Sequence, residues 1–188
     1  MLKRLFIGAP IESGKATKQA GIWKNDRQLN SNQLNWTKPE NWHITLFFLG
    51  DTTVSKISLL QNLIDESFNG IKAFKTELSG LGVFPNLNNP KVLWMGLTDI
   101  QPLLPGRNQL GELLQQNGFP FDNKPLKPHL TLARIKFMEN RTVFDSLLND
   151  YKEFSFGSVE IDRVVLYESI LTPHGSVYKP VFEKQLIG

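Results

Sequence analysis

Apolar and polar positions along the chain follow two different periods, which together predict alternating strands and helices. Short apolar runs bounded by Gly, Pro and Asn are typical of strands, and apolar residues spaced by three and four are typical of helices. Strands are predicted over residues 2–9, 41–49, 73–78, 91–97, 127–135, 158–167 and 177–186. Helices are predicted over residues 11–29, from an N-cap among residues 51–53 to Gly70, from Pro102 to Gly118, and around residues 143–151.

The order of these elements partly repeats, which indicates a fold of two related halves. A strand, a helix, a motif-bearing strand and a second helix precede residue 70, and a helix, a similar strand and a helix recur between residues 102 and 151. No segment of flexible composition separates the two halves. The pattern therefore predicts one α+β domain over residues 1–188, built as two lobes with a site between them.

Two of the predicted strands carry nearly the same residues, WHITL at 42–46 and PHLTL at 128–132. Because side chains alternate along a strand, His43 and Thr45 point to one face of the first run, and His129 and Thr131 to one face of the second. Each residue of the second pair follows its counterpart by 86 residues. This regularity is what a duplicated lobe would leave, and it predicts one site with two imidazoles and two hydroxyls.

Three interpretations of the histidines compete. A single histidine in an apolar strand is more often a packed core residue than a catalyst, but the matched second run makes packing alone a poor explanation. A metal site needs further ligands, and neither run contains Asp or Glu. Two imidazoles suit general acid–base catalysis near neutral pH, and for this reason we expect no metal and no cofactor. The third histidine, His174, falls in a Pro/Gly turn and is expected to be an exposed loop residue.

The composition of the chain says only a little about its cellular location and its partners. The chain contains no cysteine, which excludes disulfides and a thiol nucleophile and agrees with a cytoplasmic location. The formal net charge of +3 is a mild bias toward anionic partners such as nucleotides or RNA. No apolar run approaches the length needed to span a membrane, so no membrane partner is expected.

The stretches around both runs make a family resemblance specific. These are KRLFIG at 3–8, NWHITLFFLG at 41–50, VLWMGL at 92–97, KPHLTLAR at 127–134 and LYES at 166–169. The chain resembles the 2H phosphoesterase superfamily and, within it, the RNA 2′,3′-cyclic phosphodiesterases, also known as 2′-5′ RNA ligases. The resemblance covers nearly the whole chain and implies two pseudo-symmetric lobes, each an antiparallel sheet with helices packed outside, flanking a central groove.

The same resemblance implies a reaction and roles. The activity would be metal-independent opening of an RNA 2′,3′-cyclic phosphate end to a 2′-phosphomonoester, with reversible 2′-5′ ligation in some members. His43 would donate a proton to the leaving O3′, His129 would accept one from water, and Thr45 and Thr131 would hold the phosphate. The partner would be an RNA or oligonucleotide with such an end, and we expect a monomer. Two alternatives stay open: a non-catalytic module that binds RNA ends or nucleotides, and a 2H phosphodiesterase acting on another cyclic or 2′-5′-linked nucleotide.

Five residues after each histidine stand Phe48 and Arg134. By resemblance they would clamp the terminal nucleobase between a ring and a guanidinium plane. Strict alternation would point both side chains away from the histidines. The clamp therefore requires that each strand bulges, twists or ends before the fifth position.

Overall fold

A computed structural model of the chain describes residues 1–122, 125–173 and 175–188, so His174 lies outside the described residues. Two antiparallel sheets form the framework. The first sheet has the order β3 (His43–Thr53), β1 (Leu2–Pro10), β8 (Arg163–Thr172), β9 (Gly175–Gln185). The second has the order β2 (Gln33–Trp36), β6 (His129–Phe137), β5 (Val92–Leu97), β4 (Phe74–Phe84), β7 (Ser155–Ile161).

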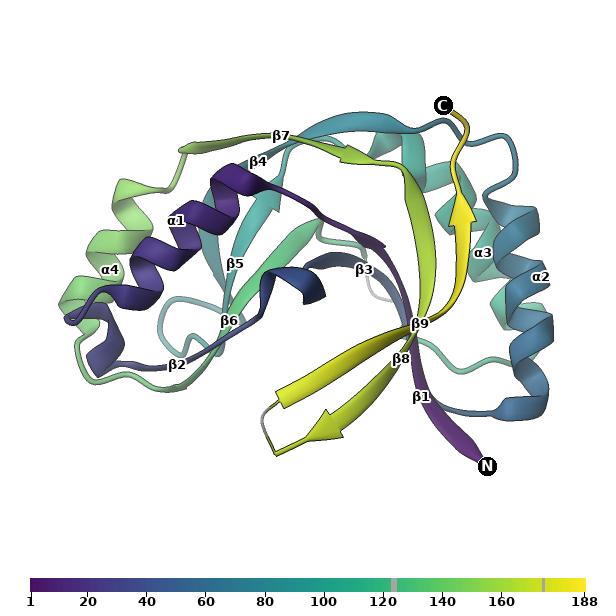
Figure 1. The fold of residues 1–188 in the computed structure, drawn as a ribbon, viewed down its shortest axis with the longest axis horizontal. Helices are drawn as coiled ribbons and strands as arrows, with labels where there is room; N and C mark the ends of the chain where they lie inside the picture. Colours follow the sequence, from purple (N-terminus) through teal and green to yellow (C-terminus); the bar gives the residue numbers. More distant parts are fainter. Residues whose placement is uncertain (123–124, 174) are drawn as a thin grey trace.

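Helices lie on the outer sides of the two sheets, as Figure 1 shows. They are α1 (Gly14–Asn25), α2 (Ile57–Ser67), α3 (Leu104–Gln116) and α4 (Arg141–Asp150). Apolar residues of the strands and of the inner helix faces form one continuous core, with Phe68, Phe144 and Phe156 among its fully buried side chains. This mixed fold of two sheets with outer helices confirms the predicted fold class.

Two helices, α1 and α3, cross from one half of the molecule to the other. α1 follows β1 of the first sheet, yet Trp23 stacks edge-on against Tyr151 and Phe156 beside the second sheet, at ring-centroid distances of 4.9 and 5.8 Å. α3 follows β5 of the second sheet, yet it packs on α2 and on Phe47 of β3. Figure 1 shows the result, with α1 and α4 at one end of the molecule and α2 and α3 at the other. Each sheet is therefore covered partly by a helix from the opposite half.

Several predicted boundaries are wrong for local reasons. Thr53 ends β3 and is the N-cap residue of a short 3-10 turn, Val54–Lys56, which leads into α2 at Ile57; its side chain makes no capping hydrogen bond. α1 is shorter than predicted, since the Ser13 hydroxyl accepts a hydrogen bond from the Ala16 N–H and fixes its start. β4 is longer than predicted and extends to Phe84.

The largest error concerns the predicted strand over residues 158–167. It is two strands in different sheets, β7 and β8, which meet at Asp162. The apolar alternation runs through both and hides the corner. The short strand β2 was not predicted, because its four residues alternate between exposed and half-buried and carry little apolar signal. Among the described residues, no helix is long and apolar enough to cross a membrane.

Candidate active site

The histidines stand at the first residues of β3 and β6. The two strands approach each other between the sheets, with pairs of Cα atoms within 8 Å. A short 3-10 turn, Pro39–Asn41, leads into β3. The position of His43 also depends on its neighbour strand, because a Cβ at Gly8 would lie 2.7 Å from the Ile44 carbonyl oxygen and 3.2 Å from His43 Cδ2. Gly8 thus allows β1 to lie close against the start of β3.

A β-bulge interrupts β3 directly after Thr45. Gly8 pairs with Thr45 and Ile7 with Phe47, so that Leu46 has no partner in β1. Leu46 and Phe47 are consequently both buried, and the alternation restarts with Phe48, whose side chain is 57% exposed. The bulge turns Phe48 back to the face that carries His43.

The same bulge recurs in β6. Trp94 pairs with Thr131 and Leu93 with Ala133, which leaves Leu132 without a partner in β5. Leu132 and Ala133 are both buried, and Arg134 returns to the surface. Of the three possibilities that the sequence left open, a bulge, a twist or a strand end, both strands use a bulge. They lie 86 residues apart, as do the paired positions on β1 and β5, Gly8 and Trp94.

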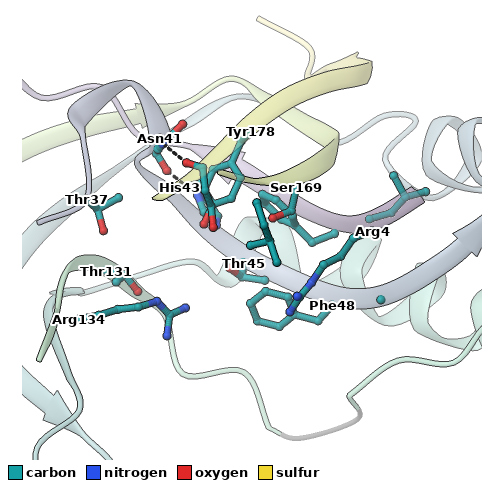
Figure 2. A pocket seen from close by; sticks show the side chains of 15 residues that line it. Arg4, Thr37, Asn41, His43, Thr45, Phe48, Thr131, Arg134, Ser169 and Tyr178 are labelled. Atoms are coloured by element: carbon teal, nitrogen blue, oxygen red, sulfur yellow. Dashed lines mark hydrogen bonds between the residues drawn. The ribbon is translucent and has the colours of Figure 1, made fainter. Parts of the chain in front are cut away.

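One cavity of about 430 Å³ collects most of the predicted residues. The first sheet contributes His43, Thr45 and Phe48, and the second contributes Thr131 and Arg134 (Figure 2). In Figure 2 the Arg134 side chain extends across the hollow from the Thr131 side, while Phe48 lies on the other side of it.

His129 does not line this cavity directly. Its ring lies against Phe84 and Trp94 of the second sheet, with centroid distances of 4.8 and 6.4 Å. It is still close enough to His43 that its charge contributes to the lowered pKa of His43. The structure therefore places the two imidazoles as electrostatic neighbours, with His129 just outside the cavity that His43 lines.

Backbone carbonyls fix the tautomer of both imidazoles. His43 Nδ1 lies 2.7 Å from the carbonyl oxygen of Asn41, and His129 Nδ1 lies 2.6 Å from that of Lys127. A carbonyl oxygen can only accept, so each Nδ1 carries a proton and donates it. Nε2 is left as the nitrogen that can accept or deliver a proton. The two carbonyls are again 86 residues apart, a signal that the sequence contains but that is visible only once the hydrogen bonds are known.

Among the described residues, three aromatic rings lie around His43 and two lie beside His129. Phe6 and Tyr178 lie 4.8 and 5.3 Å from the His43 ring centroid, and Tyr167 lies 6.1 Å away. Burial lowers the pKa of His43 to about 4, against the opposing effect of the Asn41 carbonyl and with a smaller lowering by the charge of His129. Burial also lowers the pKa of His129, opposed by the Lys127 carbonyl. Both imidazoles are therefore neutral at pH 7 in the free protein.

Sequence reasoning missed several residues of the cavity wall, including Arg4, Asn41, Ser169 and Tyr178. Arg4 and Ser169 lie within runs that carry the family resemblance, but only the pairing of β1 with β8 places them beside the motif strands. In the part of the chain that the structure describes, no three His, Asp or Glu side chains gather as a metal-binding group. The cavity offers imidazole, hydroxyl and guanidinium groups, which move protons and bind anions.

The chain is similar in sequence to a known protein family. Residues 5–186 match the family model described as the AKAP7 2′5′ RNA ligase-like domain. The chain is 35% identical over 182 residues to an RNA 2′,3′-cyclic phosphodiesterase of Archaeoglobus fulgidus, covering 96% of this chain and 99% of the relative. It is 33% identical over 153 residues to a protein of the same name from Thermotoga maritima, covering 81% and 80%.

Solved structures show the same fold. A Thermus thermophilus protein superposes with a TM-score of 0.77 at 26% identity, covering 98% of both chains. Escherichia coli LigT in its apo form superposes with a TM-score of 0.75 at 23% identity, covering 100% of this chain and 99% of that chain. The two-sheet framework with outer helices is thus shared with proteins of quite different sequence.

Proposed function

We propose that this chain, which belongs to the family of RNA 2′,3′-cyclic phosphodiesterases within the 2H phosphoesterases, opens the 2′,3′-cyclic phosphate at an RNA end and leaves a 2′-phosphomonoester. The observation that carries the proposal is the pair of imidazoles on matching strands, each with Nδ1 held by a backbone carbonyl. This arrangement supplies one proton acceptor and one proton donor without any other nucleophile.

The reaction is one in-line displacement at phosphorus. His129 Nε2 accepts a proton from water as the water oxygen bonds to phosphorus, and the bond between phosphorus and O3′ breaks. His43 Nε2 delivers its proton to the departing O3′, and the 2′-phosphate remains on the ribose. The two histidines exchange protons with solvent before the next turnover, because each ends the cycle in the opposite protonation state.

The surroundings of each ring support this assignment of donor and acceptor. His43 lies deep among Phe6, Tyr167 and Tyr178, whereas His129, although partly buried, is less deeply buried and closer to water. The pKa of His43 in the free protein is too low for a donor at pH 7. A bound phosphodiester anion raises it, since a negative charge beside an imidazole stabilises the imidazolium form.

The remaining predicted residues bind the substrate. The hydroxyls of Thr45 and Thr131 donate to the nonbridging oxygens and stabilise their charge as the transition state forms. Phe48 and Arg134, on opposite sides of the cavity, hold the terminal base between a ring and a guanidinium plane. If a 5′-hydroxyl of a second RNA replaces water, the same displacement joins the ends through a 2′-5′ linkage.

The test is product analysis on an oligonucleotide with a 2′,3′-cyclic phosphate end, in the presence of a chelator. We expect a 2′-phosphate product by chromatography against both isomers. We also expect a loss of about 100-fold or more in kcat for His43→Ala and for His129→Ala. His174→Ala is the matched control, because it removes the histidine outside both motifs. Full turnover by either motif variant would refute the mechanism, and a 3′-phosphate product would show that O2′ leaves instead.

A further inference from the structure

A second guanidinium lines the cavity at the end opposite Arg134. Arg4 of β1 lies beside Phe48 in Figure 2, while Arg134 lies near Thr131. Ser169 of β8 lines the same end, because the pairing of Leu5 with Glu168 places the next residue of β8 beside Arg4. The cavity thus has a cation at both ends and the motif threonines between them.

The register between β1 and β3 determines how far Arg4 lies from the motif residue Thr45. Gly8 lies opposite Thr45, Phe6 opposite Phe48, and Arg4 opposite Asp51. Alternation puts Gly8, Phe6 and Arg4 on one face, about 13 Å apart from first to last at the usual rise of a strand. The long Arg4 side chain spans part of this distance, and a nucleoside lying over Phe48 spans the rest.

The charge of Arg4 is not neutralised within the described part of the chain. Its sequence neighbour Lys3 forms an ion pair of 2.7 Å with Glu168 on the other face of the sheet, but no ion pair of Arg4 is found among the described residues. Asp51 is opposite Arg4 in the ladder and also lines a separate cavity with Lys56 and Phe119, and no ion pair joins it to Arg4 among the described residues. An exposed guanidinium at the rim of an anion-binding cavity is suited to bind phosphate.

Arg4 also breaks the duplication. The position 86 residues later is Pro90, so the second half has no corresponding cation. The groove is therefore directional even though its motifs are repeated. Of the two corresponding strands β1 and β5, only β1 has an arginine at this position. A linear substrate whose reacting phosphate lies between the motif strands therefore meets such an arginine only where it runs along β1.

We propose that Arg4 and Ser169 form a subsite for the 5′-phosphate, or phosphodiester, of the terminal nucleotide. This rests on the proposed function and adds a substrate class to it: nucleotides that carry a 5′-phosphate group, as every RNA chain end does, in preference to nucleoside 2′,3′-cyclic phosphates. Arg4 donates to the phosphate oxygens through its guanidinium, and Ser169 donates through its hydroxyl.

A second cavity of about 460 Å³ offers the competing exit for the RNA chain. It continues beyond Arg134 and is lined by Trp36, Lys38 and Val177 among others. Lys38 is exposed and lies 3.9 Å from Glu40, so its charge is partly offset there. Lys38→Ala is therefore the matched control, since it removes one exposed cation at the other end of the groove.

The kinetic experiment compares adenosine 2′,3′-cyclic phosphate with the same compound carrying a 5′-phosphate. For the wild type, we expect the 5′-phosphate to raise kcat/KM by about 10-fold, as a charge-assisted hydrogen bond allows. Arg4→Met should bring the ratio of kcat/KM with the 5′-phosphate to kcat/KM without it close to one. Arg4→Lys should keep part of this ratio, because lysine retains the charge without the planar guanidinium. Lys38→Ala should leave the ratio unchanged.

A binding experiment separates this subsite from the chemistry. Calorimetry with adenosine 2′-monophosphate and adenosine 2′,5′-bisphosphate requires no turnover. The ratio of the two association constants should change among the wild type, Arg4→Met, Arg4→Lys and Lys38→Ala in the same way as the kinetic ratio. A wild-type ratio of one, a ratio that survives Arg4→Met, or a ratio lost in Lys38→Ala would each overturn the subsite. If the binding ratio behaves as expected but neither cyclic compound is hydrolysed, the proposed function fails and the phosphate subsite stands.

Discussion

The substitution Gly8→Ala tests how closely catalysis depends on the contact between β1 and β3. The added Cβ would lie 2.7 Å from the Ile44 carbonyl oxygen and 3.2 Å from His43 Cδ2. Backbone atoms border the site on β3, so the strands themselves must separate by several tenths of an ångström. The nearest side chain that moves with them is the proposed proton donor.

Two effects with different magnitudes follow. Overpacking at a strand contact costs about 1–3 kcal/mol of unfolding free energy. A misplacement of about 1 Å at a reacting group costs about 100-fold in rate, so a shift of half that size should lower kcat by roughly 10-fold. We therefore expect Gly8→Ala to reduce kcat per folded molecule, with the folded fraction measured by urea denaturation under the assay conditions.

Gly106→Ala provides a control with a similar steric conflict far from the histidines. Its Cβ would lie 2.6 Å from Phe68 Cδ1 and 2.8 Å from the Ser67 carbonyl oxygen, between α3 and α2. We expect it to lose stability but to keep wild-type kcat per folded molecule. The reasoning is refuted if Gly8→Ala is destabilised and yet turns over at the wild-type rate, because His43 would then tolerate the displacement.

Two further predictions concern protonation. The pKa values of both imidazoles are lowered in the free protein, so kcat/KM should reach its maximum below pH 6.5. It should fall as the pH rises above the higher of the two pKa values. A pH optimum above 7 would contradict the burial of the two histidines. The lowered pKa of His43 should also weaken the fold in acid, since the unfolded chain binds a proton from about pH 6.5 downward that the folded chain takes up only near pH 4. This contribution to the unfolding free energy is fully present above pH 6.5, and about 3 kcal/mol of it is lost by pH 4. Urea denaturation at a series of pH values should therefore show that the unfolding free energy of His43→Gln falls less steeply with decreasing pH than that of the wild type. Parallel curves would exclude a buried neutral His43.

The candidate residues of the two motifs could be identified from the sequence because their signal is local and repeated. The His-x-Thr alternation and the interval of 86 residues can be worked out without coordinates, and the resemblance adds that each strand bulges, twists or ends before Phe48 or Arg134. The bulges at Leu46 and Leu132 themselves carry no distinctive residue, because an apolar residue is equally typical of a regular buried strand. Only the conflict between alternation and the resemblance indicated them.

Other features depend on partners distant in sequence and could not be predicted. The corner at Asp162 separates two strands of similar composition, and the difference between them is which sheet they join. Tyr178 reaches His43 because β9 pairs with β8 and β8 with β1. The depth of His43, and with it the direction of its pKa shift, comes from this assembly of three strands and not from the residues next to it in the chain.

The exchange of α1 and α3 between the halves bears on the distance between the imidazoles. Two independent lobes joined by a hinge would open and close, and the separation of the histidines would vary with that motion. Here each sheet is braced by a helix that the other half supplies, with Trp23 anchored against Tyr151 and Phe156, and α3 against α2. Separating the two sheets would expose the apolar faces of these helices, and this cost opposes a change in the distance between the imidazoles. An isolated half of the chain would leave part of one sheet face uncovered and one helix without the surface on which it packs.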